Sequence, residues 1–133
     1  MFEILMYTDE SGNSPVDDFL DELRNSNFKL YVKTMRSLGL LESTGNLLTM
    51  PYSKYLQEGI FELRTIQGNN ITRLFYFFDK GKVIVVDHGI IKKTQKIPKA
   101  DIELAVSRKL SYERRHENEI QGKTRQRPSG SEV

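Results

Sequence analysis

The chain has 133 residues, of which 38% are hydrophobic and 29% are charged, as is typical of a single soluble globular domain. No apolar run approaches the roughly 18 residues needed to cross a membrane, and the N-terminus lacks the basic flank and cleavage site of a secretory signal. The absence of cysteine excludes disulfides and thiolate metal sites, and two histidines are too few for an ordinary zinc site. We therefore expect a cytoplasmic protein with no metal and no cofactor.

Charge is distributed unevenly along the chain. Residues 1–26 carry seven acidic side chains against one basic, a net charge of −6, whereas residues 92–127 carry eleven basic against five acidic, a net charge of +6. This separation favours a phosphate-binding surface held apart from an acidic helix. A solvated basic helix and tail would explain the same charge pattern equally well.

The first half of the chain predicts a strand over residues 2–7 and then two helices. Ser14 and Pro15 are a typical cap and first residue for a helix that ends at the Asn25-Ser26-Asn27 break. A second helix is expected over residues 28–41, followed by a loop over residues 43–59 that contains at most a short helical turn. The apolar stripes that should face inward are Val16, Phe19, Leu20 and Leu23 in the first helix, and Leu30, Tyr31, Met35 and Leu38 in the second.

In the second half of the chain, the pattern of apolar residues changes to the two-residue period of strands. The predicted strands cover residues 60–67, 71–79 and 83–91. The short connections between them predict an antiparallel meander. Pro98 begins a last helix with a stripe of Ile102, Ala105, Val106 and Leu110. The resulting order, β-α-α-β-β-β-α, is an α+β fold in which helices pack on a small sheet. Residues 1–116 are predicted to form this domain, and residues 117–133 a polar, disordered tail.

Basic side chains are concentrated on the predicted strands and directly after them. Arg64 lies in the first meander strand, and Arg73 lies in the apolar central strand, where it should pair or face a wet groove. The third strand leads into Lys92-Lys93-Thr94-Gln95-Lys96. Converging cations of this kind bind RNA phosphates and stabilise the charge that builds up when a phosphodiester is cleaved.

Each of these residues also has a structural explanation. Arg64 could pair with Glu62 or with an acid of a helix, and Arg73 could pair with Asp17 or Asp21 of the acidic helix. The lysine run could be a solvated connection. A histidine on an apolar strand, such as His88, is more often a hydrogen-bonded packing residue than a catalyst.

Three segments together resemble the HigB-type toxins of the RelE/ParE superfamily, including the phage-derived branch. They are Glu62-Leu63-Arg64, then Thr72-Arg73-Leu74-Phe75-Tyr76-Phe77, and then Val83–Ile91 leading into Lys92-Lys93-Thr94-Gln95-Lys96-Ile97-Pro98. The opening Ser-Pro-Val-Asp-Asp-Phe-Leu resembles the start of the family's first helix. The resemblance covers roughly residues 2–115 and implies a RelE-like fold.

The resemblance also implies a function. It suggests a type II toxin that cleaves mRNA on the ribosome without a metal, leaving a 2′,3′-cyclic phosphate, and that is neutralised by a HigA-like antitoxin with a helix-turn-helix domain. Residues that match the family are Arg64, Arg73, Lys92, Lys93 and Lys96. We expect Arg64, Arg73 and Lys93 to be catalytic, and Lys92, Lys96 and His88 to bind RNA.

Two other functions fit the same residues. A ParE-like inhibitor of DNA gyrase shares the fold, so fold alone does not decide between them. A nucleic-acid-binding module without catalytic activity would be held by phosphate contacts and would leave no cleaved product.

Overall fold

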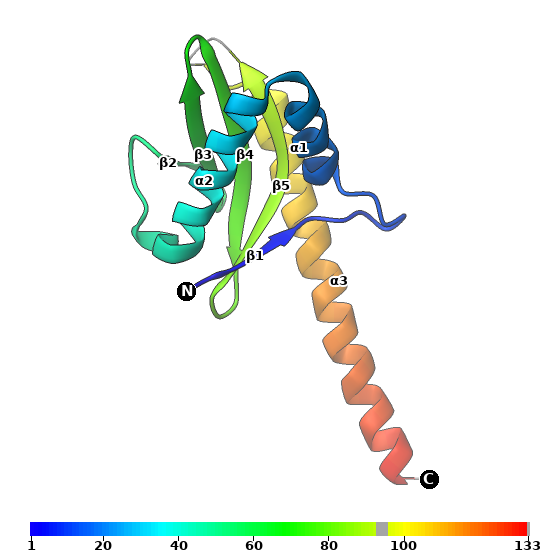
Figure 1. The fold of residues 1–133 in the computed structure, drawn as a ribbon. Helices are drawn as coiled ribbons and strands as arrows, with labels where there is room; N and C mark the ends of the chain where they lie inside the picture. The colour runs from blue at the N-terminus through cyan, green and yellow to red at the C-terminus, as the bar shows by residue number, and fades with distance from the viewer. Residues whose placement is uncertain (93–95, 133) are drawn as a thin grey trace.

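A computed structural model describes residues 1–92 and 96–132 of the chain, with side chains described as far as residue 117 outside the 93–95 gap (Figure 1). The elements in chain order are β1 (Glu3–Met6), α1 (Pro15–Ser26), α2 (Phe28–Thr44), the 3-10 helix η1 (Gly45–Leu47), β2 (Ser53–Gln57), β3 (Ile60–Gln67), β4 (Asn70–Asp79), β5 (Val83–Lys92) and α3 (Lys99–Glu132).

The strands form one five-stranded sheet in the order β1-β5-β4-β3-β2. Its centre is the predicted meander, because β3 pairs antiparallel with β4 and β4 antiparallel with β5. Two edge strands change the predicted sheet. β2 pairs antiparallel with β3, and β1 pairs parallel with β5, so the sheet is mixed and not purely antiparallel.

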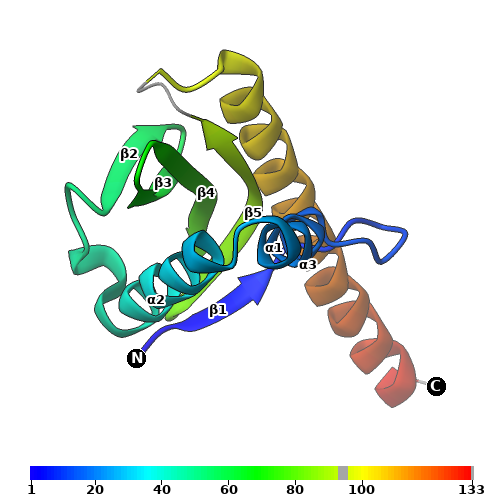
Figure 2. The ribbon, with the colours of Figure 1, turned by 45° about the horizontal axis from the view of Figure 1, so that its top comes forward.

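Helices cover both faces of this sheet. α1 and α2 lie on one face and α3 crosses the other, as Figures 1 and 2 show from two directions. The α+β class predicted from the sequence is therefore confirmed, and the arrangement is compatible with the RelE-like fold. No helix in the described part of the chain is both long enough and apolar enough to cross a membrane.

The predicted start of α1 is confirmed, because Ser14 Oγ accepts a hydrogen bond from the backbone N–H of Asp17 at 3.3 Å. The inward face of α2 differs from the prediction at Met35, which is 38% exposed. Thr34 is buried in its place, and its hydroxyl lies 2.9 Å from the hydroxyl of Thr72 in β4. A polar residue can be buried there because each hydroxyl satisfies the other.

The predicted loop over residues 43–59 is wrong in part, because it contains the edge strand β2, whereas η1 is the short helical turn that the prediction allowed. Leu110, predicted to face inward from the last helix, is 53% exposed. The predicted disordered tail falls almost entirely on residues whose side chains lie outside the described part of the structure. The domain boundary at residue 116 therefore stays a prediction.

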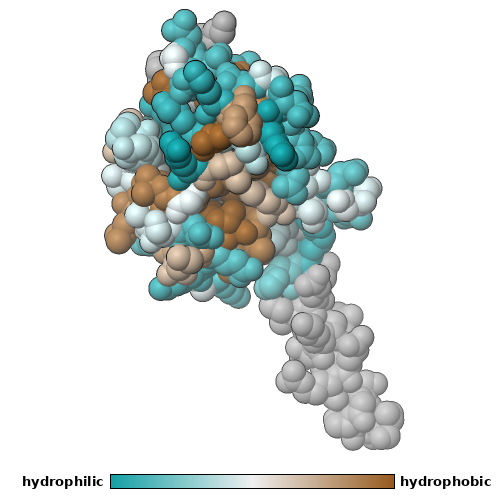
Figure 3. All heavy atoms as spheres, viewed as in Figure 1, coloured by the Kyte–Doolittle hydropathy of each residue, from teal (hydrophilic) through white to brown (hydrophobic). Residues whose placement is uncertain are grey.

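Two apolar clusters lie on opposite sides of the sheet. The cluster under α1 and α2 includes Leu23, Leu41 and Tyr76, and the cluster under α3 includes Phe75, Phe77 and Ala105. On the face with α1 and α2, apolar side chains that reach the surface form several patches among hydrophilic ones (Figure 3). Each face of the sheet thus carries an apolar core beneath its helices.

Candidate nucleic-acid interface

The strand register brings the predicted basic residues onto one face of the sheet. Arg64 of β3 is directly opposite Arg73 of β4, and Arg73 is opposite Ile90 of β5. The next row towards the strand ends contains Lys92, which is opposite Ile71. Directly opposite residues of antiparallel strands project to the same side, and successive rows on one face are roughly 7 Å apart. Arg64, Arg73 and Lys92 therefore share the face on which α3 packs.

Arg73 is the least accessible member of this group. Its side chain is fully buried and forms an ion pair with Glu62, which is itself only 1% exposed. Glu62 lies diagonally across the β3–β4 pair, on the same face as Arg64 and Arg73. The pairing predicted with Asp17 or Asp21 is therefore wrong, and Arg73 in this arrangement is enclosed by the protein. Its catalytic role stays a prediction.

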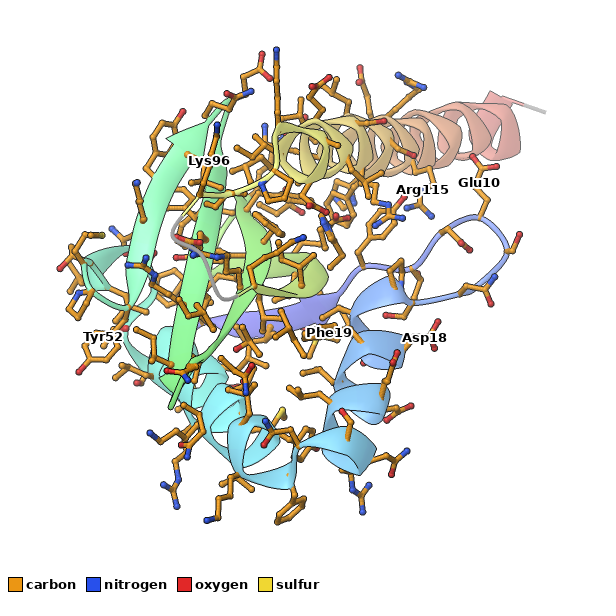
Figure 4. The ribbon with its side chains drawn as sticks, turned by 90° about the horizontal axis from the view of Figure 1, so that it is seen from above. Glu10, Asp18, Phe19, Tyr52, Lys96 and Arg115 are labelled. Carbon is orange, nitrogen blue, oxygen red and sulfur yellow. The ribbon has the colours of Figure 1, made fainter. Side chains whose placement is uncertain are left out.

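The remaining cations of the predicted site are closer to solvent. Arg64 is half-buried, and both Lys92 and Lys96 are exposed. Figure 4 places Lys96 on the connection between the strands and α3. Lys93, predicted to be catalytic, lies outside the described residues. Arg64, Lys92 and Lys96 are thus the predicted residues that can present positive charge to a ligand.

His88 is held on both sides by carboxylates. Its Nδ1 contacts Oδ2 of Asp87, and its Nε2 lies 3.2 Å from Oδ1 of Asp101 in the first turn of α3. The ring is stacked on Phe75, with 4.7 Å between ring centroids. His88 is also 6% exposed, so it has the contacts of a hydrogen-bonded packing residue, which was the structural alternative. Its predicted role in RNA binding stays a prediction.

One exposed cation on this face was missed from the sequence. Lys54 of β2 is directly opposite Glu62, so it extends the basic face to the sheet edge. Sequence reasoning placed it in a loop. The signal that could have found it is the short alternation in Ser53-Lys54-Tyr55-Leu56-Gln57, in which Lys54 and Leu56 occupy the same side.

A cavity of about 370 Å³ opens beside Lys92, between α1 and the end of β5. Phe19 and Asp101 are among its lining residues. Figure 4 shows Phe19 reaching from α1 towards the sheet, while Asp18 lies on the outer side of the helix. Glu22 of α1 also lines this cavity, so an acidic side chain of α1 and Lys92 of β5 share it.

Together these residues can bind a polyanion, because exposed ammonium groups attract phosphate and a half-buried guanidinium can grip its oxygens in a fork. Among the described residues, no three His, Cys, Asp or Glu side chains are placed to hold a metal ion. The chemistry that the described face offers is therefore that of cations and hydrogen-bond donors.

Comparison with known families identifies the chain. A family model described as Phage derived protein Gp49-like (DUF891) matches residues 21–110, which is about two thirds of the chain. The chain belongs to this family. The Gp49-like match confirms the phage-derived part of the resemblance and leaves the HigB assignment as a prediction. No curated protein matches the chain.

The Gp49-like match begins within α1 and ends within α3, so it contains the whole meander and both flanks of the lysine run. Arg64, Arg73 and Lys92 all lie inside it. The basic face therefore belongs to the part of the chain that defines the family.

Proposed function

We propose that this Gp49-like protein is a HigB-type toxin of the RelE/ParE superfamily, a metal-independent endoribonuclease that cleaves mRNA on the ribosome. The observation that carries the proposal is the placement of Arg64, Lys54 and Lys92 on one face of the sheet, next to the connection that bears Lys96. The proposal is supported further by the family match and by the RelE-like arrangement of sheet and helices.

In the proposed reaction, the RNA supplies its own nucleophile. The 2′-oxygen bonds to the neighbouring phosphorus as its proton passes to an amine of the lysine run, and the bond from phosphorus to the 5′-oxygen breaks. A proton returns to that 5′-oxygen, and a 2′,3′-cyclic phosphate remains. The protein's part is to stabilise the extra negative charge of the pentacoordinate state, which preorganised cations do well.

Burial divides the basic residues into three groups in this proposal. Arg64 contacts the scissile phosphate, since it is the half-buried arginine of the row. Lys54, Lys92 and Lys96 hold flanking phosphates. Arg73, enclosed with Glu62, supports the strand pair from which Arg64 projects.

The proposed partners are the ribosome with its mRNA and a HigA-like antitoxin with a helix-turn-helix domain. An antitoxin would neutralise the toxin either by covering the basic face or by holding the protein away from the ribosome. Co-purification followed by a structure of the complex distinguishes these modes.

The test is cleavage of a defined mRNA on programmed ribosomes, with 5′ ends mapped and 3′ ends identified chemically. We expect a 2′,3′-cyclic phosphate, and no cleavage where the nucleotide carries a 2′-O-methyl group. Arg64→Ala should slow cleavage by about 100-fold, as loss of one donor to a developing charge does elsewhere. Arg36→Ala is the matched control, because Arg36 is an exposed arginine of α2 on the other face.

Three results would contradict the proposal. Products with 5′-phosphates and 3′-hydroxyls would indicate metal-assisted hydrolysis. RNA binding that leaves no product would indicate a binding module. Gyrase-linked DNA breaks without mRNA cleavage in cells would indicate a ParE-like inhibitor.

A further inference from the structure

A cluster of four polar side chains joins the end of β5 to the start of α3. Asp87 is fully buried, and its Oδ2 contacts Nδ1 of His88 and lies 3.4 Å from Nη1 of Arg108. His88 continues the chain of contacts to Asp101 at 3.2 Å. We call Asp87, His88, Asp101 and Arg108 the β5–α3 clamp.

The clamp depends on an irregularity in β5. Phe75 is opposite His88 and Tyr76 is opposite Val86, so Asp87 is an extra residue in a β-bulge. A bulge turns two consecutive side chains of one strand towards the same region, which a regular strand cannot do. The bulge thereby brings Asp87 and His88 together on the α3 side.

The clamp attaches α3 to the sheet less stably than apolar contacts would. Oδ1 of Asp87 is buried with no hydrogen-bond partner among the described residues, and an unsatisfied buried acceptor lowers stability. Apolar side chains of similar volume would hold the same helix at less cost. His88 does not meet a ligand directly, because it is buried and carboxylates contact both of its ring nitrogens.

The position of the clamp indicates its role. β5 ends at Lys92 and α3 begins at Lys99, and the contact between His88 and Asp101 joins residues 13 apart in sequence on the two sides of this connection. Fixing both ends of a short connection restricts the positions that its residues can take. Reactions that depend on charge stabilisation require cations already held in place before the substrate arrives.

We propose that Asp87, His88, Asp101 and Arg108 are positioning residues that fix both ends of the lysine-bearing connection, so that Lys92 and Lys96 meet RNA phosphates in a productive arrangement. This inference rests on the proposed endoribonuclease function. It assigns His88 to support of the RNA-binding residues and not to contact with RNA.

A matched contact allows the role to be tested against simple attachment of α3. The hydroxyl of Tyr112 in α3 donates to Oδ2 of Asp79, at the far end of β4, with 2.8 Å between the oxygens. This contact also attaches α3 to the sheet through an aspartate, but at a strand end that does not lead into the lysine run. Asp101→Ala removes the contact with His88, and Tyr112→Phe removes the contact with Asp79.

We would measure cleavage on programmed ribosomes, RNA affinity, thermal midpoint and amide hydrogen exchange for both variants. Asp101→Ala should lower kcat at least 10-fold with RNA affinity changed less than 3-fold, because mispositioned lysines still attract phosphate. Exchange of the amides of residues 103–106, the first that α3 bonds within itself, should rise in this variant. Tyr112→Phe should leave kcat within 2-fold and leave those amides protected, and Asp101→Glu should restore part of the activity.

The outcomes separate this inference from the proposed function. If both variants lose cleavage in proportion to their thermal midpoints, the clamp is only an attachment and the inference is wrong. Unchanged exchange at residues 103–106 in Asp101→Ala would also overturn it, whether or not the wild-type protein cleaves RNA. Raised exchange in a protein that never cleaves RNA would support the clamp and contradict the nuclease.

Discussion

Arg73 shows how far the environment of one residue can be deduced from sequence. Its place in an apolar strand predicts that it should pair or face a wet groove, and the structure shows that it pairs. The partner follows from the hairpin: Gln67 pairs with Asn70 across a two-residue turn, and that register places Arg64 opposite Arg73 and Glu62 diagonally next to it. The prediction chose acids of α1 because the face on which α1 packs is a tertiary property that strand alternation does not contain.

Removing Arg73 should therefore mainly lower the free energy of unfolding, because Arg73 is buried in an ion pair. Arg73→Ala leaves the carboxylate of Glu62 buried without its cation, which typically costs about 3–5 kcal/mol of unfolding free energy. The double change Glu62→Leu with Arg73→Met should recover most of that loss, because an apolar pair needs no charge compensation.

Urea unfolding of Arg73→Ala and of the double variant measures the loss and the recovery of unfolding free energy. Arg64→Ala is the control from the same row, and it should cost less, since Arg64 is half-buried. An Arg73→Ala protein as stable as the wild type would show that the ion pair is not what holds this part of the sheet.

At the scale of elements, the meander and helices were predictable and the two edges of the sheet were not. Helical periodicity and the Ser14 cap located α1, and short turns located β3, β4 and β5. β2 is only five residues long and follows Pro51, so its alternation is too short to stand out. The parallel pairing of β1 with β5 joins distant segments, and no local pattern encodes it.

Gly89 explains how α1 can approach β5 closely. A Cβ atom at this position would lie 2.6 Å from side-chain atoms of both Phe19 and Leu74. Gly89→Ala should therefore force these side chains apart and destabilise the protein by about 1–3 kcal/mol.

Gly39 in α2 is the matched control, since a Cβ atom there meets nothing within 4 Å. Gly39→Ala should stabilise the protein by about 0.5–1 kcal/mol, because alanine is the better helix former. Thermal and urea unfolding of the two variants should thus give opposite signs, and a stabilised Gly89→Ala protein would show that the α1–β5 contact is loosely packed.

At the scale of the whole molecule, α1 and the cations of the basic face lie on opposite faces of the sheet. α1 packs its apolar stripe on one face, while Arg64, Lys54 and Lys92 project from the other. Charge counts along the chain predict a basic surface apart from an acidic helix, but they do not say which cations form it. Which cations reach the surface required the structure, because burial of Arg73 and exposure of Lys54 depend on strand pairing.

This separation predicts a specific salt dependence for RNA binding. Each phosphate contact with single-stranded RNA contributes about 0.7 to the slope of log affinity against log salt. Lys54→Ala and Lys92→Ala should each reduce the magnitude of the slope by about that amount. Lys29→Ala should leave it unchanged, because Lys29 is exposed on α2, across the sheet. Titrations of a fluorescent oligonucleotide at several salt concentrations check this, and equal effects of all three variants would indicate non-specific attraction only.

The pairing of β1 with β5 has a consequence for the synthesis of the protein. Glu3 pairs with Val83, 80 residues later in the chain, and translation at about 5–20 residues per second takes about 4–16 s to cover that distance. During that time the nascent chain carries β1 without β5, and the basic face lacks Lys92. A protein that we propose acts on ribosomes thus has no complete basic face until β5 has been translated.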